Sequence, residues 1–399
     1  MSDVEQDDGE DQELPDDSEP SPERQTELEK AYEANIAAGN PPYKGVRIRT
    51  RGELRWVMEK RQWFGGAFAG FQDANYVISV ARPDLRGINL EDVHLPRIAL
   101  ARADLSGARL LHANLAGAHL LDADLSHADL QAANLQSARL QNANLTGALA
   151  MDANFSGAWL TAVDLAATNL RRARFDIDTA LIGIHLDEWT QVADVLWNGV
   201  PLSQIEWRQI RELGDEHLAR FPAPSTPAAL KNCVEAARAN RQLATALRSQ
   251  GMADEADDFA YRARQMQRLV LRHQVFMQET EFHINPWYRL RKLMAYLGSG
   301  LLDLIAGYGY RPGRSLLAYI FIILTFAGLY LLNGQFAAPH LHWDEAVVLS
   351  VSSFHGRGFF TTDTHLGDTL ARLAAAEAIV GLLVEITFIA TFTQRFLSR

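Results

Sequence analysis

A five-residue period is the feature that most limits how this chain can fold. From Leu85 to Phe175 a leucine or phenylalanine recurs at every fifth position, with one interruption at Ala150. A small or short branched residue lies two positions before each of them, as Ala103 lies before Leu105. A period of five fits neither an α-helix nor the simple alternation of a strand. A four-sided coil satisfies it if the leucine and the small residue both point inwards, so the sequence predicts such a coil.

This run resembles the pentapeptide repeat family, whose fold is a right-handed quadrilateral β-helix. The resemblance implies a β-helix over residues 83–208. About nineteen repeats at four per turn give about five turns, which stack to roughly 24 Å at strand spacing. A short polar residue often precedes the leucine, where its side chain can bond the backbone of a turn; examples are Asp104, Asn114, Asp124, Asn134 and Asn144. After Phe175 the pattern decays, which predicts an irregular last turn.

The outward positions of the coil carry mixed charge. Some members of the family mimic DNA with an acidic exterior, but here those positions include Arg97, Arg102, Arg109, Arg139 and Arg172. We therefore expect no DNA mimicry and no nucleic-acid partner. Three histidines, His112, His119 and His127, fall on turns or outer faces, so we expect surface side chains rather than a metal site.

The segment before the coil divides into a tail and a cap. Residues 1–30 hold 13 acidic and 2 basic side chains, which accounts for the whole net charge of −11. Residues 1–28 therefore read as a disordered acidic tail. Residues 50–82 are expected to form a helical cap, because Glu53–Phe64 has apolar residues at helical spacing and a repeat array needs its end covered.

Helices are predicted between the coil and the C-terminal apolar runs. Residues 226–283 indicate an α-helical hairpin that turns at Gln250–Met252 and resembles a single tetratricopeptide-like unit; Cys233 is expected to pack within it. Residues 286–308 begin with aromatic and basic side chains around Trp287, as an interfacial membrane helix does. A third membrane span at this place stays open as an alternative.

Two apolar runs near the C-terminus are each about long enough to cross a bilayer, which takes roughly 20 residues of helix. They are Ser315–Leu332 and Ala374–Phe392. Between them Trp343–Phe360 contains a short apolar helix followed by a glycine-bearing loop. Irregular backbone at membrane depth is tolerated only when protein or a wet cavity surrounds it. The loop is thus either the lining of a pore or an ordinary extracytoplasmic loop.

Residues 314–397 resemble the two-transmembrane potassium-channel pore domain. The resemblance makes Asp344–Phe354 the pore helix and Gly381 the hinge of the inner helix. It makes the following residues filter-like: Ser353, Phe354, His355, Gly356, Arg357 and Gly358. The family's filter reads Thr-Val-Gly-Tyr-Gly, whereas residues 354–358 here read Phe-His-Gly-Arg-Gly. The architecture therefore carries over better than the potassium selectivity, and the sequence leaves the permeant ion open.

Two carboxylates lie in the second apolar run and share a helix face with Gly381. A charged group in hydrocarbon is costly, so such groups face a cavity or a partner. We expect Glu377 at the outer boundary, in water. Glu385 lies deeper and is the stronger candidate for conduction or gating; the alternative is a buried pair with Arg395 or with a neighbouring subunit.

The predicted fold class is therefore multidomain: a quadrilateral β-helix, a helical hairpin and a two-span helical pore module. No catalytic set, phosphate-binding loop or zinc motif is present in the sequence, so we expect neither an enzyme nor a cofactor. Basic residues lie just before the first apolar run and just after the second. This bias predicts that both termini lie on the cytoplasmic side of a bacterial-type inner or plasma membrane.

The sequence leaves two functions open, one a transport function and the other a binding function. The first is a homotetrameric ion channel with a cytoplasmic coil for assembly or regulation. The second is a membrane-anchored scaffold whose coil binds a cytoplasmic protein partner. In both, the lipid bilayer is a partner of the C-terminal helices.

Overall fold

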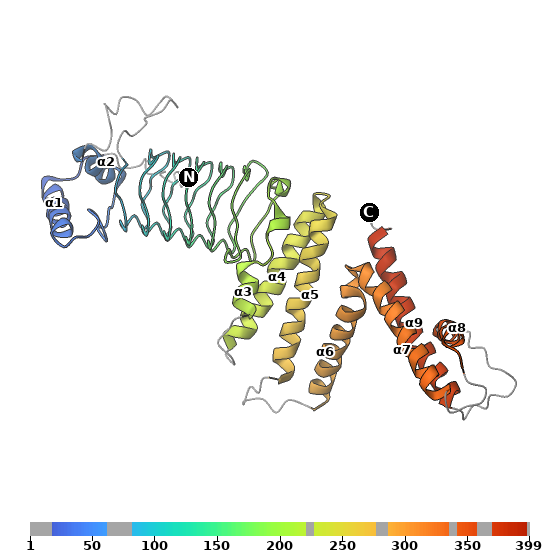
Figure 1. The fold of residues 1–399 in the computed structure, drawn as a ribbon. Helices are drawn as coiled ribbons and strands as arrows, with labels where there is room; N and C mark the ends of the chain where they lie inside the picture. The colour runs from blue at the N-terminus through green and yellow to red at the C-terminus, as the bar shows by residue number, and fades with distance from the viewer. Residues whose placement is uncertain are drawn as a thin grey trace, which may run out of the picture. The chain divides into compact units, whose positions relative to one another are not determined.

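The computed structural model describes residues 18–61, 82–220, 227–276, 286–334, 341–356 and 369–396. The chain forms two compact units, Met1–Glu255 and Ala256–Arg399. The first contains the repeat coil and its two covers, and the second contains the apolar helices (Figure 1). Each unit is described by itself.

The repeats wind into a coil whose successive turns are joined by parallel bridges. From Asp84 to Asn154 the first partner of each bridge pairs with a residue 20 positions further on, as Asp84 pairs with Asp104. Twenty residues are four repeats, so the coil has four sides. Within the described residues the contacts are isolated bridges rather than longer strands, because each side is only a few residues wide. The four-sided coil predicted from the period of five is confirmed.

The interior of the coil consists of the leucine and alanine columns that the period predicts. Every central leucine from Leu85 to Leu145 is buried, and the residue two positions before each is buried as well. Ala150, which interrupts the leucine series, also points inwards. Further along, Phe155 stacks on Phe175 with ring centroids 5.4 Å apart, and Phe175 stacks on Trp197 at 5.5 Å.

The corners of the coil are turns in which the second residue has a positive φ, such as Gly107 at +66°. On the side of the coil that leads into this corner, the Asp104 carboxylate accepts a hydrogen bond from the Ser106 backbone N–H at 3.2 Å. The same bond recurs at the other four positions that the sequence singled out, which are Asn114, Asp124, Asn134 and Asn144. The predicted turn role of these side chains is confirmed.

The regular pattern ends at Phe175, as the sequence predicts, and the coil continues beyond it with longer, irregular sides. Trp159 pairs with Ala180, 21 residues on, and Arg174 pairs with Leu196, 22 residues on. At the first inserted residue, Thr179 takes the inward position. Its buried hydroxyl lies 3.2 Å from the Phe155 carbonyl and 2.9 Å from the Asp176 carboxylate. Asp187 and Thr190 repeat this arrangement two sides later.

Two helices and an added strand segment cover the first turn. Arg47 bridges to Asn89 and extends the ladder by one step. Helix α1 (Pro22–Ala37) begins at the N-cap Ser21, and α2 (Arg51–Lys60) begins at Thr50. Arg24 of α1 binds Glu53 of α2 at 2.9 Å.

The prediction of disorder up to residue 28 is therefore wrong for residues 22–28, because Ser21 and Pro22 provide a helix start. The second half of the predicted cap, residues 62–81, lies outside the described residues.

The other end of the coil is covered by two short 3-10 turns, η1 (Leu202–Gln204) and η2 (Trp207–Gln209), and by helices α3 (Gly214–Arg220) and α4 (Pro227–Ser249). Asp215 of α3 is fully buried. Its carboxylate accepts hydrogen bonds from Arg171 at 2.9 Å and from the Val192 and Ala193 backbone N–H groups at 2.7 and 3.0 Å. This set of bonds fixes α3 to the last turn. Cys233 in α4 is buried, and burial raises the pKa of its thiol.

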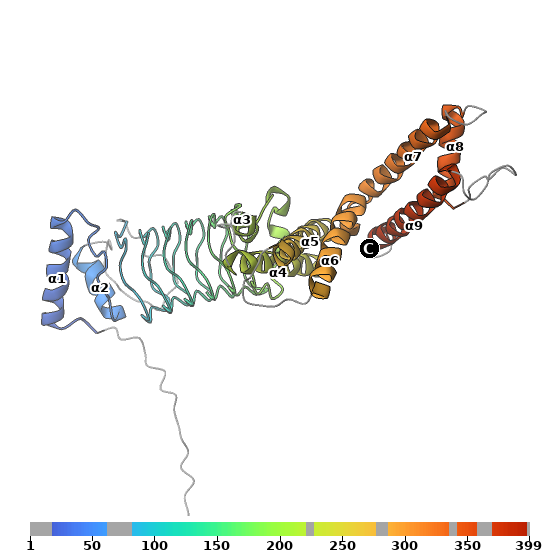
Figure 2. The ribbon, with the colours of Figure 1, turned by 90° about the horizontal axis from the view of Figure 1, so that it is seen from below.

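The second unit holds most of α5 (Ala253–Phe276), together with α6 (Pro286–Ala306), η3 (Gly307–Gly309), α7 (Pro312–Gly334), α8 (Trp343–Phe354) and α9 (Thr369–Phe396). The chain changes direction between α6 and α7, where Tyr308 has a φ of +55° between two glycines that also have positive φ (Figure 1). Figure 2 shows α8 where α7 ends and α9 begins.

A polar cluster joins α5, α6 and the start of α7. The Asp303 carboxylate accepts hydrogen bonds from the Tyr261 hydroxyl at 2.9 Å and from Arg314 at 3.1 Å, and Arg268 lies 3.5 Å away. The Arg311 guanidinium lies over the Tyr261 ring at 4.2 Å. These contacts fix the first turn of α7 to two earlier helices of the same unit.

Candidate functional site

Helix α8 is the feature of the second unit that sequence reasoning singled out, and its start is encoded locally. Asp344 and Glu345 lie in its first turn, where acidic side chains favour a helix N-terminus. Glu345 also accepts a hydrogen bond from the His342 backbone N–H at 3.0 Å, which closes a capping box. The helix ends at Phe354, and Gly356 follows with a φ of +68°, a conformation that favours glycine.

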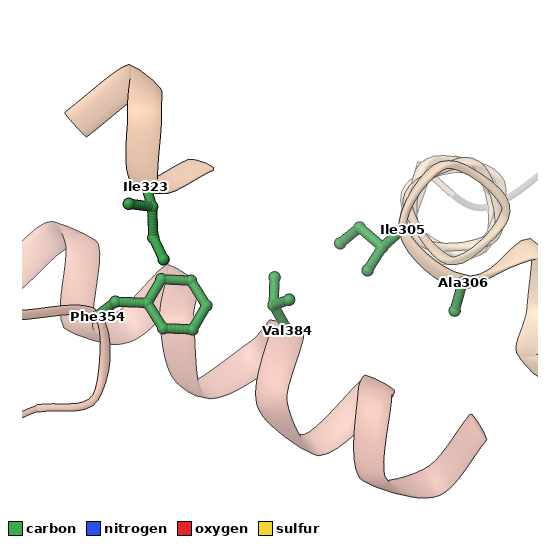
Figure 3. Packing of buried hydrophobic residues seen from close by; sticks show 5 residues of the cluster. All are labelled: Ile305, Ala306, Ile323, Phe354 and Val384. Atoms are coloured by element: carbon green, nitrogen blue, oxygen red, sulfur yellow. The ribbon is translucent and has the colours of Figure 1, made fainter. Parts of the chain in front are cut away.

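The helix lies between α7 and α9 along its whole length. At its first turn Ala346 packs with Ala327 and Tyr330 of α7 and with Ala374 of α9. At its last turn Phe354 packs with Ile323 and Val384 (Figure 3). Ile323 is the middle residue of α7, which has 23 residues, and Val384 lies near the middle of the 28-residue α9. Helix α8 therefore begins near one end of the α7–α9 pair and ends at half its length.

Gly381 allows the end of α8 to lie this close to α9. A Cβ atom at this position would come within 2.1 Å of the Phe354 carbonyl oxygen and 2.9 Å of its carbonyl carbon. Real Cβ contacts do not occur at such distances, so no larger residue fits without movement of α8. The resemblance implies a hinge at Gly381; in the structure α9 is one continuous helix there, and the glycine provides space for the backbone of α8.

Glu377 is fully buried beneath α8, with 0% of its surface exposed. The Tyr330 hydroxyl of α7 donates a hydrogen bond to Glu377 Oε2 at 2.7 Å. The Ser350 hydroxyl of α8 is hydrogen-bonded to Glu377 Oε1 and lies 2.9 Å from the Ile323 carbonyl. The expectation that Glu377 lies in water is therefore wrong, because α7 and α8 both cover it.

Glu385 lies beside the end of α8. Its carboxylate is 3.3 Å from His355 Nε2, and the two side chains are 36% and 39% exposed. The His355 Nδ1–H donates to the Val351 carbonyl at 2.8 Å, and the Tyr319 hydroxyl lies 3.5 Å from Nε2. The sequence predicted Glu385 as a polar candidate but not His355 as its neighbour. The side chain of Arg395, which the sequence offers as an alternative partner, is outside the described part of the chain.

The filter-like residues fall into three groups. Ser353 and Phe354 are buried against α7 and α9, whereas His355 and Gly356 are exposed at the end of α8. Arg357 and Gly358 lie outside the described residues. Sequence reasoning missed Tyr319, Tyr330 and Ser350, and the one signal for them was a hydroxyl side chain within an apolar helix.

Large apolar side chains of α7 and α9 remain uncovered in the second unit. The stretches Gly313–Asn333 and Thr369–Ala390 are long and apolar enough to cross a membrane, and 22% of the 18-residue core of each is buried. The exposed residues include Leu316, Leu317, Ile320, Phe321, Leu324, Ile379, Leu382, Leu383, Ile386 and Ile389. An apolar surface of this extent marks a membrane or protein contact.

A comparison with known families settles the nature of the coil. Residues 84–120 and 108–147 match the family model for pentapeptide repeats, in 8 copies. The coil is built of pentapeptide repeats. The matched residues lie wholly within the coil and before the apolar helices. No curated protein matches the chain.

Several solved structures are similar to the pentapeptide-repeat coil. The pentapeptide repeat protein alr5209 from Nostoc is 33% identical over 23% of this chain and 85% of its own, with a TM-score of 0.20. Rfr23 from the cyanobacterium Cyanothece is 30% identical over 26% and 86%, with a TM-score of 0.16. HetL, involved in heterocyst differentiation regulation in Nostoc, is 26% identical over 29% and 67%, with a TM-score of 0.15.

The exterior of the pentapeptide-repeat coil is polar over most of its length. His112 and His127 are exposed at turns, and His119 is half-buried on a face, where burial lowers its pKa. In the described part of the chain, no group of three or more His, Cys, Asp or Glu side chains could hold a metal ion.

Proposed function

We propose that this chain is one subunit of an oligomeric membrane ion channel whose pentapeptide-repeat coil serves assembly or regulation in the cytoplasm. The observation that supports this function best is the position of α8. It enters between two helices of membrane-spanning length and ends at half their length, with His355 and Gly356 exposed at its end. A helix that only connects two anchors has no physical reason to return to mid-depth.

The polar residues at that depth support the same proposal. His355 and Glu385 are half-exposed beside the apolar faces of α7 and α9. Ionisable groups within a membrane face a water-filled cavity or a partner, because hydrocarbon does not solvate them. One copy of α8 cannot enclose such a cavity, so several copies must surround it. Closed cyclic symmetry is the usual arrangement of identical subunits, and we propose a homotetramer.

Ion selectivity depends on Arg357, which the sequence places in the loop after α8. Four guanidinium groups around a narrow path would repel cations unless each is paired with a carboxylate. The candidate carboxylates for this pairing are Asp344, Glu345 and Glu377. Glu377 is already bonded by Tyr330 and Ser350, which leaves Asp344 and Glu345. We propose a pore that is anion-preferring or weakly selective.

Reconstitution of the purified protein tests the channel proposal. In mild detergent we expect a particle of about four times the 44.4 kDa of one chain. In planar bilayers with asymmetric potassium chloride we expect currents that reverse away from the potassium equilibrium potential. A monomeric particle would contradict the oligomer, and a reversal at the potassium potential would contradict the proposed selectivity.

A membrane-anchored scaffold is the second candidate function, and one observation on the coil favours it. Large apolar side chains are exposed on the last turns, among them Trp159 at 51%, Ile177 at 72% and Ile182 at 54%. Such side chains are suited to a protein partner. The variant His355→Cys in a Cys233→Ser background separates the two functions. A pore admits a charged thiol reagent to mid-depth, whereas a plain anchor does not.

Glu385→Gln is expected to change the gating of the channel and its dependence on acid pH. The substitution keeps the shape of the side chain and removes its charge, so the contact of Glu385 with His355 loses its ionic part. A half-exposed pair of this kind contributes up to about 1 kcal/mol, a factor of about five in an equilibrium. Single-channel open probability between pH 5 and pH 8 measures the effect.

The matched control is His355→Asn, alone and combined with Glu385→Gln. If the two residues act as a pair, the effect of Glu385→Gln disappears in the His355→Asn background. Currents and pH dependence that are unchanged in Glu385→Gln alone would remove Glu385 from the candidate site.

A further inference from the structure

We propose that Glu377 carries a proton and that this neutral carboxyl group holds α8 between α7 and α9, so that loss of the proton releases α8. The proposal concerns how α8 is held and adds a pH-sensitive latch to the proposed pore. The argument has three parts: the burial of the group, the charges around it and the number of protons that its hydrogen bonds require.

The burial of Glu377 is complete and involves three helices. Its own helix is α9, the Tyr330 hydroxyl reaches it from α7, and the Ser350 hydroxyl reaches it from α8. With 0% of the residue exposed, water does not solvate the carboxyl group within this unit. An ionised carboxylate in such a place needs a positive partner.

The described residues contain no such partner for Glu377. Tyr330 is the titratable group that faces it from α7, and α8 faces it with the Ser350 hydroxyl, which does not titrate. No lysine, arginine or histidine of the described residues makes an ion pair with it. A tyrosine loses its proton near pH 10, so it stays neutral over the physiological range.

Counting protons along the hydrogen bonds gives the same result. The Tyr330 hydroxyl donates its one proton to Glu377 Oε2. The Ser350 hydroxyl also has one proton, and two acceptors compete for it, the Ile323 carbonyl and Glu377 Oε1. If Glu377 Oε1 carries a proton, it donates to Ser350 and Ser350 donates to Ile323, so that every contact has one donor and one acceptor. An ionised Glu377 leaves one of these contacts without a proton.

The chain of bonds Tyr330–Glu377–Ser350–Ile323 therefore ties the middle of α8 to both neighbouring helices. Released into water, a glutamate is ionised at neutral pH. The held form then binds one proton more than the released form. By linkage the released form gains about tenfold for each pH unit in this range, so the hold on α8 weakens as pH rises.

Two measurements on the full-length protein in bilayers test the latch. Infrared spectra at neutral pH should contain the C=O stretch of a protonated carboxylic acid that shifts with carbon-13-labelled glutamate and is missing in Glu377→Gln. Hydrogen exchange of the α8 amides should then be compared between the parent and Glu377→Gln. The glutamine has an N–H donor and a C=O acceptor, so it reproduces the bonds of the neutral acid at every pH.

We expect the two proteins to show equal protection of α8 at low pH. As pH rises, protection in the parent should fall about tenfold per pH unit relative to the glutamine variant. A ratio that stays constant with pH, a glutamine variant that is unprotected at all pH values, or an absent infrared band would each overturn the proposal. Neither readout uses a current, so a protein that does not conduct would contradict the channel and leave the latch intact.

Discussion

Leu125→Asp is expected to unfold the middle of the pentapeptide-repeat coil. Leu125 is fully buried within the coil, where its side chain contributes to the leucine column. The substitution removes about 2–5 kcal/mol of packing and adds a carboxylate that has neither water nor a positive partner. The sum of the two terms is comparable with the whole stability of a typical domain. Thermal unfolding followed by circular dichroism, together with the yield of folded protein, measures the effect.

Gln136→Asp is the matched control for this prediction. Gln136 is exposed at a corner of the same coil, so the variant introduces the same charge on the outside. We expect its unfolding temperature to stay close to that of the parent, within the usual range of about 0.5 kcal/mol for surface changes. A Leu125→Asp protein that melts and expresses like the control would show that the central leucine does not point inwards.

Gly381→Ala is expected to displace the end of α8 and to disrupt the candidate site. The added methyl group would lie 2.1 Å from the Phe354 carbonyl oxygen, which is backbone and cannot rotate away. Ordinary contact needs more than 1 Å of further separation, so α8 or α9 must shift. Overpacking of this severity costs about 3 kcal/mol or more. Loss of protection of the α8 amides in hydrogen exchange measures the displacement.

Gly328→Ala on α7 is the corresponding control, because a Cβ atom at Gly328 meets nothing within 4 Å. Alanine is the better helix former by about 1 kcal/mol, so this variant should be neutral or slightly stabilised. The two substitutions are chemically identical and lie in helices of similar character. Equal behaviour of the two variants would mean that the close contact between Gly381 and Phe354 does not exist in the protein.

The sequence predicted the coil well because its signal is local and repeated many times. A leucine at every fifth position is satisfied by a four-sided coil with the leucines inside. The short polar residue before many of the leucines, such as Asp104, identifies the turns. The longer sides at Asp176 and Asp187 could not be predicted, because an inserted residue breaks the five-residue spacing in the sequence. In the structure a buried threonine fills the inward position there, so the coil continues. Helix α1 escaped because its acidic composition resembles that of a disordered tail.

The candidate site could be predicted only in part, for a physical reason. Apolar length alone indicates α7 and α9, and a capping pattern indicates α8. The position of Glu377 depends on Tyr330 and Ser350, which lie 47 and 27 residues away in the chain. Contacts between residues so distant leave no periodic signal in one sequence. For the same reason the sequence offers Arg395 or a neighbouring subunit as the partner of Glu385, and not His355.

The covering of the coil at both ends has a consequence for self-association. An open coil of parallel bridges would present a row of backbone N–H and C=O groups at each end, and a second coil could add to that row without limit. Here α1 and α2 lie at one end and α3 with its anchored Asp215 lies at the other. End-to-end growth into fibres is thereby blocked, and the coil can be present at high local concentration without polymerising.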